Sequence, residues 1–126
     1  MNQTLFAYGT LQHPDIISFV LDRVPPHQPA LLHDFARYAI KGQDFPGLIS
    51  QPGAQTEGTA FYEISLTEWE MLDRYESDLY ERQTVAMLPQ NGPPESAEVY
   101  ILPPHNHHVL STTLWELKNY RPNPQP

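Results

Sequence analysis

The stretch QTEGTAFYEISLTEWEMLDRYE, residues 55–76, contains a strand signal followed directly by a helix signal. Its first part, Gln55–Ile64, is rich in the β-branched and aromatic residues that favour strands. Its second part opens on SLTE at 65–68, the capping-box pattern in which a serine hydroxyl and a glutamate carboxylate bind the first free amide groups of a helix. Ile64 before this cap and Trp69 after it are placed to form the accompanying hydrophobic staple. We therefore predict a strand over 55–64 and a helix over 65–76.

Hydrophobic periodicity and turn residues divide the rest of the chain into short elements. Further strands are expected at Thr4–Tyr8, Ala30–Ile40, Tyr80–Leu88 and Glu98–Leu102, further helices from His13-Pro14 to Leu21 and from Ser111 to about Asn119, and turn-forming residues at Lys41–Pro52. Several strands, two or three short helices and no strict alternation of the two indicate an α+β fold with a mostly antiparallel sheet curled into a small barrel. We expect one domain over residues 1–120 and a proline-rich tail over 121–126.

Composition disfavours several classes of function. Fifteen acidic and seven basic residues give the 126-residue chain a formal net charge of −8, which disfavours binding to nucleic acid phosphates or anionic membrane surfaces. No apolar run approaches the ~20 residues that cross a bilayer, and the N-terminus has no signal-peptide pattern. The absence of cysteine removes thiolate nucleophiles and cysteine-bound zinc, and it fits a cytoplasmic protein. The 14 prolines leave one long gap, Gly53 to Leu88, in which we look for function.

Glu76 is a candidate for chemistry because of its place on the predicted helix. Counted from Leu66 at about 100° per residue, Trp69 lies at about 300°, Leu72 at about 240° and Glu76 at about 280°. The carboxylate then points along the apolar stripe at a helix C-terminus, where both burial and the helix dipole raise its proton affinity. A general base that works near neutral pH needs such a shift. Alternatively, Glu76 lies just past the helix end and faces solvent, or pairs with Arg74 or Arg82.

The turn after the first strand is the second candidate. Tyr8-Gly9-Thr10-Leu11 follows a buried strand, so its amides can point into a cavity at the strand end. Glycine permits a close backbone approach, and successive free N–H groups bind anions. Because the protein is acidic overall, neutral backbone dipoles are a suitable means of binding an anionic substrate. The alternative is an ordinary turn with no ligand.

Taken together, several short motifs resemble those of the γ-glutamylcyclotransferase-like (AIG2-like) proteins. They occur in the expected order: YGTL at 8–11, FPGL at 45–48, EGTAFYE at 57–63, LDRYE at 72–76, YER at 80–82 and AEVY at 97–100. The resemblance covers residues 4–102 and comes closest to the γ-glutamylamine cyclotransferase type, which has a Leu-Asp-x-x-Glu-Ser pattern. Two departures are a short bridge, residues 77–79, between Glu76 and Tyr80, and an unmatched segment after Pro103.

The resemblance implies a mixed β-barrel with flanking helices and a cavity over the opening loop. It implies that Tyr8–Leu11 binds the γ-glutamyl part of a small-molecule substrate, that Glu76 is the general acid and base, and that Tyr80 lines the cavity. The implied reaction uses no cofactor or metal. The α-amine of a γ-glutamyl amine or small γ-glutamyl peptide attacks its own γ-carbonyl, which gives 5-oxoproline and a free amine.

Three alternatives remain open at this point. The chain could be a non-catalytic module that binds a small γ-glutamyl or carboxylate metabolite, although such a pocket gains nothing from the buried negative charge of Glu76. Tyr80 could be an ordinary half-buried strand aromatic. The run His105-Asn106-His107-His108 could bind a metal, but adjacent and i+2 histidines rarely supply a full ligand set, so no metal site is expected.

Overall fold

Strand β1 (Leu5–Ala7) is short and buried on both faces in the computed structural model, which describes residues 3–119. It pairs antiparallel with β3 (Pro46–Phe61) and parallel with β5 (Glu95–Ile101). Leu5 and Ala7 belong to the apolar cluster beneath the helices, whereas Phe6 belongs to the cluster between the strands. This two-sided burial explains the uninterrupted apolar run in the sequence.

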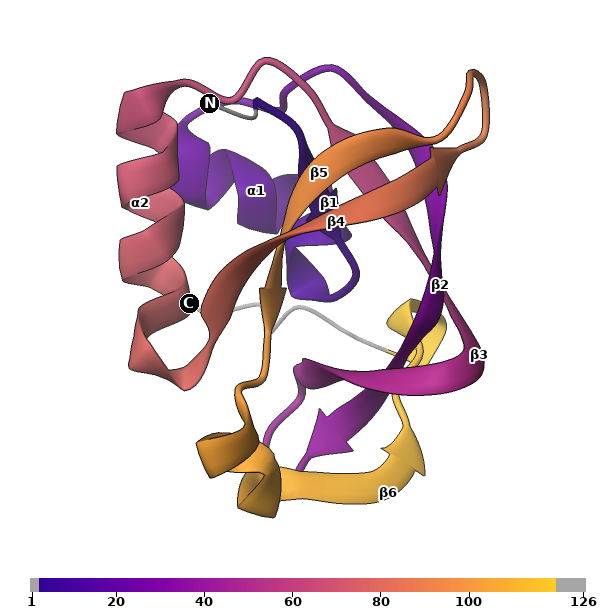
Figure 1. Ribbon diagram of the computed structural model, residues 1–126. Helices are drawn as coiled ribbons and strands as arrows, with labels where there is room; N and C mark the ends of the chain where they lie inside the picture. The colour runs from indigo at the N-terminus through magenta and orange to yellow at the C-terminus, as the bar shows by residue number, and fades with distance from the viewer. Residues whose placement is uncertain (1–2, 120–126) are drawn as a thin grey trace.

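The strands close into a barrel. Their order is β3-β1-β5-β4-β2, and β2 (His27–Ile40) pairs again with β3, with β4 (Glu81–Pro89) between β5 and β2 (Figure 1). Every pairing except β1 with β5 is antiparallel. A sixth strand, β6 (Leu110–Leu114), extends the sheet from one end of β2. The prediction of an α+β fold with a mostly antiparallel barrel is confirmed.

Two α-helices cover one side of the barrel. Helix α1 (Pro14–Leu21) begins with proline at its first position, and α2 (Leu66–Glu76) packs beside it (Figure 1). Trp69 and Leu72 are the α2 side chains that enter the cluster beneath the helices. No helix within residues 3–119 has the length and apolar character needed to span a membrane.

The capping box that opens α2 is present. The Ser65 hydroxyl accepts a hydrogen bond from the Glu68 N–H at 3.1 Å, and the Glu68 carboxylate accepts one from the Ser65 N–H at 3.0 Å. Arg23, just after α1, binds both oxygens of the same carboxylate at 2.7 Å. Burial opposes ionisation of Glu68, but the hydrogen bond from Arg23 is the larger effect and lowers its pKa. The cap therefore ties the two helices together as well as starting one of them.

Loss of the Ser65 hydroxyl should weaken the fold measurably. We expect Ser65→Ala to lower the free energy of unfolding by about 1–2 kcal/mol, because the Glu68 N–H loses its acceptor. Ser65→Asn, which supplies a replacement acceptor, should stay within about 0.5 kcal/mol of the wild type. Urea unfolding followed by circular dichroism measures both. Equal losses for the two variants would show that the cap contributes nothing.

The segment from Ser111 is a strand, so the prediction of a last helix there is wrong. Leu110–Leu114 pairs with β2, and the Ser111 hydroxyl donates to the Ala39 carbonyl at 2.7 Å instead of capping a helix. The run Ser-Thr-Thr favours extended backbone, and the β2 edge supplies the partner that the sequence alone does not reveal. Within the predicted helix, the described residues form only a short 3₁₀ turn, Leu117–Asn119. The expected tail lies outside the described residues.

Strand β3 begins at Pro46, inside the segment expected to consist of turn formers. The β2–β3 register runs from His33 opposite Gln55 to Phe35 opposite Ser50, so β3 bulges outward between these points. Asp34 sits opposite the bulge with a φ of 68°, and its carboxylate accepts a hydrogen bond from the Gly53 N–H at 2.9 Å. The bulge accommodates the proline and glycine of this segment without ending the strand.

Candidate active site

A cavity of about 300 Å³ opens at the end of β1, a size within the usual range of small-molecule sites. Its walls come from the turn after β1, the start of β3, the end of α2 with the bridge that follows, and β5. All six residues singled out from the sequence line it: Tyr8, Gly9, Thr10, Leu11, Glu76 and Tyr80. The other lining residues are Leu5, Phe6, Ala7, Phe45, Pro46, Tyr75, Ser77, Leu79 and Tyr100.

Glu76 is the last residue of α2, so the helix extends as far as the periodicity argument requires. Its side chain is half-buried and lines the cavity. Among residues 3–119 its carboxylate has no hydrogen bond or ion pair, and Arg82 instead pairs with Asp73, with 3.3 Å between Nε and Oδ1. Burial raises the pKa of Glu76 to about 8. A carboxyl with this pKa can accept and return a proton near neutral pH.

The end of α2 is held against the barrel by neighbours of Glu76. Asp73, one turn earlier, accepts a hydrogen bond from the Tyr100 hydroxyl of β5 at 2.7 Å. The Arg82 guanidinium of β4 stacks over the Trp69 ring, 4.6 Å from its centroid. These contacts join α2 to two adjacent strands, and they fix where the Glu76 side chain enters the cavity.

The raised pKa of Glu76 makes the free energy of unfolding depend on pH. The unfolded carboxyl titrates at ~4.3, whereas the folded one titrates at about 8, so between these values only the folded state holds the proton. The free energy of unfolding contributed by this group therefore falls as pH rises through that window and is flat outside it. Since the side chain is partly open to water, which reduces the penalty, we expect a loss of about 1–3 kcal/mol.

Urea unfolding of the wild type and Glu76→Gln at pH 5 and pH 8.5 measures this loss. Glutamine has no charge to bury, so the stability of the variant relative to the wild type should increase at the higher pH. A difference between the two proteins that is the same at both pH values would contradict the raised pKa.

The turn after β1 presents backbone to the cavity. It forms a single 3₁₀ turn, Thr10–Gln12, in which the Gly9 carbonyl accepts from the Gln12 N–H at 3.1 Å. A side chain at Gly9 would place its Cβ 3.0 Å from the ring of Pro46, so a larger residue would push against the start of β3. The Tyr8 hydroxyl donates to the Tyr100 carbonyl at 2.6 Å. The tyrosine is thus an anchor, and the backbone of the turn is free to meet a ligand.

Tyr80 is also committed to a protein contact. Its hydroxyl donates to the Pro46 carbonyl at 2.6 Å, which leaves only its oxygen lone pairs for a ligand. Burial, assisted by the nearby Glu76 carboxylate, raises the pKa of Tyr80, so the phenol stays neutral. In the cavity it can therefore accept a hydrogen bond from an ammonium or amide group.

Sequence reasoning missed part of the site. Tyr75 and Tyr100 line the cavity, as do Pro46 at the start of β3 and Phe45 just before it. All four residues lie in motifs that were recognised but gave them no role: Phe45 and Pro46 in FPGL, Tyr75 in LDRYE and Tyr100 in AEVY. Asn106 left no signal at all, yet its side-chain amide donates to the Leu79 carbonyl at 3.0 Å and holds the bridge that forms one wall.

The histidine run near the C-terminus has a structural contact. His105, His107 and His108 lie in a 3₁₀ segment, Pro104–Val109, and the His107 ring binds the Leu102 carbonyl at 2.9 Å. Within the described part of the chain, no three His, Cys, Asp or Glu side chains converge in a way that would hold a metal ion.

The family of the chain follows from its sequence as a whole. Residues 5–121 match the family model described as gamma-glutamyl cyclotransferase, AIG2-like. The chain belongs to this family. The match extends past Pro103, where the motif resemblance had ended, and so includes β6. An Arabidopsis thaliana relative, AIG2-like protein C, is 35% identical over 98 residues, which are 77% of this chain and 57% of that protein. The chain spans a little over half the length of the curated relatives it matches.

Solved structures share the fold of this family member. The solution structure of an Arabidopsis thaliana protein superposes with a TM-score of 0.77 at 28% identity, covering 86% of this chain and 74% of that one. A protein described as a gamma-glutamyl cyclotransferase superposes with a TM-score of 0.69 at 19% identity, covering 80% of this chain and 66% of that one. At that identity the second likeness establishes the fold alone. The family and barrel predictions are thus confirmed, whereas the roles of individual residues remain predictions.

Proposed function

We propose that the protein is a γ-glutamylcyclotransferase that converts a γ-glutamyl amine or small γ-glutamyl peptide into 5-oxoproline and a free amine. The observation that carries this proposal is the half-buried carboxylate of Glu76, which has no hydrogen bond or ion pair among residues 3–119 and lines the same cavity as residues 8–11. Membership of the gamma-glutamyl cyclotransferase, AIG2-like family supports the reaction class. The absence of cysteine is in keeping with action in the cytoplasm.

The reaction is intramolecular, so positioning supplies much of the rate. The cavity would hold the substrate with its α-amine against its own γ-carbonyl, the near-attack arrangement that replaces a bimolecular encounter. At neutral pH the α-amine is protonated and cannot attack. Glu76 would first take one proton from the α-ammonium, and the free amine would then attack the γ-carbonyl. As the old C–N bond breaks, Glu76 would return its proton to the leaving nitrogen, and the second proton on the ring nitrogen would pass through solvent to the released amine. No covalent enzyme intermediate, metal or cofactor enters this scheme.

The substrate carboxylate would be bound by backbone N–H groups of the turn after β1. The described residues that line the cavity include no Lys, Arg or His, so within that part of the chain the donors available to an anion are backbone N–H groups and hydroxyls. The Tyr80 oxygen would accept a hydrogen bond from the substrate amine or amide. Free N–H groups would also stabilise negative charge that develops on the γ-carbonyl oxygen.

The outer part of the cavity favours an uncharged leaving group. Phe45, Pro46, Tyr75 and Leu79 contribute aromatic and aliphatic surface to the cavity, and among residues 3–119 no cationic side chain lines it to hold a second carboxylate. We therefore propose γ-glutamyl amines with apolar amine portions as better substrates than γ-glutamyl dipeptides.

The test is 5-oxoproline release from a panel of γ-glutamyl alkylamines, γ-glutamyl aromatic amines and γ-glutamyl dipeptides, followed by chromatography. We expect product from the amines at the highest kcat/KM. Tight binding of panel members with no product from any of them would replace the enzyme by a metabolite-binding module. Faster turnover of dipeptides would contradict the proposed substrate preference and leave the reaction class intact.

A further inference from the structure

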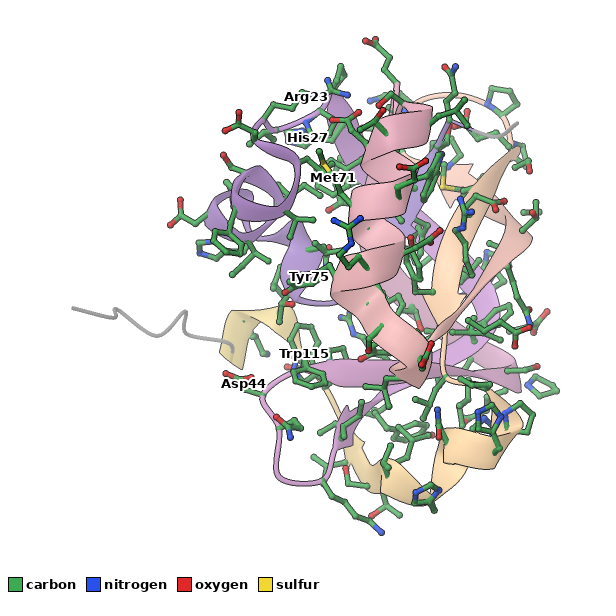
Figure 2. All side chains as sticks on the ribbon, turned by 90° about the vertical axis from the view of Figure 1, so that its left-hand side faces the viewer. Arg23, His27, Asp44, Met71, Tyr75 and Trp115 are labelled. Carbon is green, nitrogen blue, oxygen red and sulfur yellow. The ribbon has the colours of Figure 1, made fainter. Side chains whose placement is uncertain are left out.

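Arg37 lies behind the turn that follows β1, on the side away from the cavity. It is a half-buried residue of β2, and its guanidinium donates to the Tyr8 carbonyl at 2.7 Å and to the Glu57 carbonyl at 2.6 Å through Nη1. Its Nε donates to the Trp115 carbonyl at 2.9 Å, and the guanidinium stacks on the Trp115 ring at 5.5 Å. Figure 2 shows Trp115 beside Asp44, whose carbonyl accepts from the indole N–H at 3.0 Å.

The guanidinium is a cation held by neutral partners. Within residues 3–119 no carboxylate lies within ion-pair distance of Arg37, and Glu57 and Glu116 act on it only at longer range. Desolvation lowers its pKa, but a guanidinium remains protonated at any physiological pH. Burying an arginine against backbone carbonyls alone is costly, so its placement calls for an explanation beyond packing.

Peptide geometry connects Arg37 to the cavity. The described chain has no cis peptide bond, so the carbonyl of Tyr8 and the N–H of Gly9 point in opposite directions across their shared peptide plane. The carbonyl is directed at Arg37, which does not line the cavity, whereas Gly9 does line it. Among the described residues the Gly9 N–H has no hydrogen-bond partner. Arg37 therefore sets the orientation of an unused donor and also polarises the peptide that carries it.

We propose that Arg37 is a positioning residue that gives the cavity its preference for a carboxylate, by orienting the Tyr8–Gly9 peptide and placing a positive charge behind it. The proposal rests on the proposed function only in taking the bound anion to be the α-carboxylate of a γ-glutamyl group or of 5-oxoproline. Arg37 touches neither substrate nor product, and its effect passes through one peptide group.

The size of the effect follows from the geometry. A carboxylate bound to the Gly9 N–H would lie about 7–8 Å from the guanidinium, the sum of two hydrogen bonds and the width of a peptide group. At an effective dielectric constant of about 20, attraction over this distance corresponds to a factor of about 10–100 in affinity. A neutral ligand of the same shape would gain almost nothing.

The experiment compares two probes, 5-oxoproline and its uncharged carboxamide, by calorimetry or NMR titration at fixed ionic strength. We expect the wild type to bind 5-oxoproline more tightly than the carboxamide, and Arg37→Gln to lose about 10–100-fold in affinity for 5-oxoproline with little change for the carboxamide. Arg37→Lys keeps the charge and should restore most of the preference. Retention of the wild-type ratio of the two affinities by folded Arg37→Gln would overturn the proposal.

Arg23→Gln is the matched control. It removes the same charge from the chain and breaks the ion pair with Glu68, but it lies away from the cavity. Arg23→Gln should lose stability and keep the wild-type ratio of the affinities for 5-oxoproline and its carboxamide. If Arg37 acted only through overall structure or net charge, Arg23→Gln and Arg37→Gln would show the same ratio. That outcome also overturns the proposal.

A measurement on the wild type alone covers the case in which Arg37→Gln does not fold. The amide resonance of Gly9 should shift strongly downfield when 5-oxoproline binds and much less when the carboxamide binds. No response of Gly9 to saturating 5-oxoproline would overturn the proposal. Because these measurements follow binding and not turnover, a protein that shows the carboxylate preference but releases no 5-oxoproline from any substrate would refute the proposed enzyme and leave the role of Arg37 standing.

Discussion

Glu76→Gln is expected to slow 5-oxoproline release by about 10²–10⁴-fold at pH 8–9, the usual contribution of a positioned acid and base. Glutamine keeps the shape of the side chain and its place at the end of α2, but it cannot take a proton from the substrate ammonium or return one to the leaving amine. The carboxylate has no ion pair to lose among residues 3–119, so the folded structure should be unaffected. Steady-state assays with the best γ-glutamyl amine from the panel measure the change.

Two matched variants separate catalysis from charge. Glu70→Gln removes a carboxylate from an exposed position of the same helix and should keep the wild-type rate. Glu76→Asp keeps the carboxylate but withdraws it by one methylene, so its rate should fall between those of the wild type and Glu76→Gln. Turnover by Glu76→Gln equal to that of Glu70→Gln would remove Glu76 from the mechanism.

Trp69→Ala is expected to lower the free energy of unfolding by about 3–5 kcal/mol, a large share of the stability of a small protein. The indole is 1% exposed, fills the cluster between the two helices and the barrel, and carries the Arg82 guanidinium on its face. Its removal leaves a cavity and frees Arg82 from the stack. Urea or thermal unfolding followed by circular dichroism measures the loss.

Leu66→Ala provides the control, because Leu66 is 62% exposed on the same helix. That change should stay within about 0.5 kcal/mol of the wild type. A comparable loss in both variants would show that burial of the indole does not set the stability of α2, because alanine is the better helix former at both positions.

Local chemistry made much of the fold predictable. The SLTE cap and the apolar periodicity predicted a helix over 65–76, and α2 runs from Leu66 to Glu76 with Ser65 as its cap. Proline at the first position identified α1, and the uninterrupted apolar run identified β1 as a buried strand. Each of these signals depends on residues within one helical turn or one strand of each other. Over that range a sequence predicts local structure without knowledge of the tertiary contacts.

Long-range contacts made the remainder unpredictable. Residues 110–114 are a strand because the edge of β2 pairs with them, and 46–54 remain in β3 because Asp34 stabilises the bulge across the hairpin. The same holds at the site. Glu76 could be placed by helical periodicity, whereas Arg37 and Asn106 reach it through backbone carbonyls of distant residues, and such hydrogen bonds leave no pattern in the sequence.

The parallel pairing of β1 with β5 has a consequence for how the protein is made. Leu5 lies opposite Glu98. Strand β1 therefore cannot pair with β5 until most of the chain has been synthesised. Contacts between residues so far apart in the sequence slow folding, because the entropy cost of bringing the two segments together comes before the favourable contacts of the barrel form. The lining of the cavity runs from Leu5 to Tyr100, so the complete cavity requires both strands to be in place. A metabolite that binds in the cavity is therefore expected to stabilise the completed fold and not the partly synthesised chain.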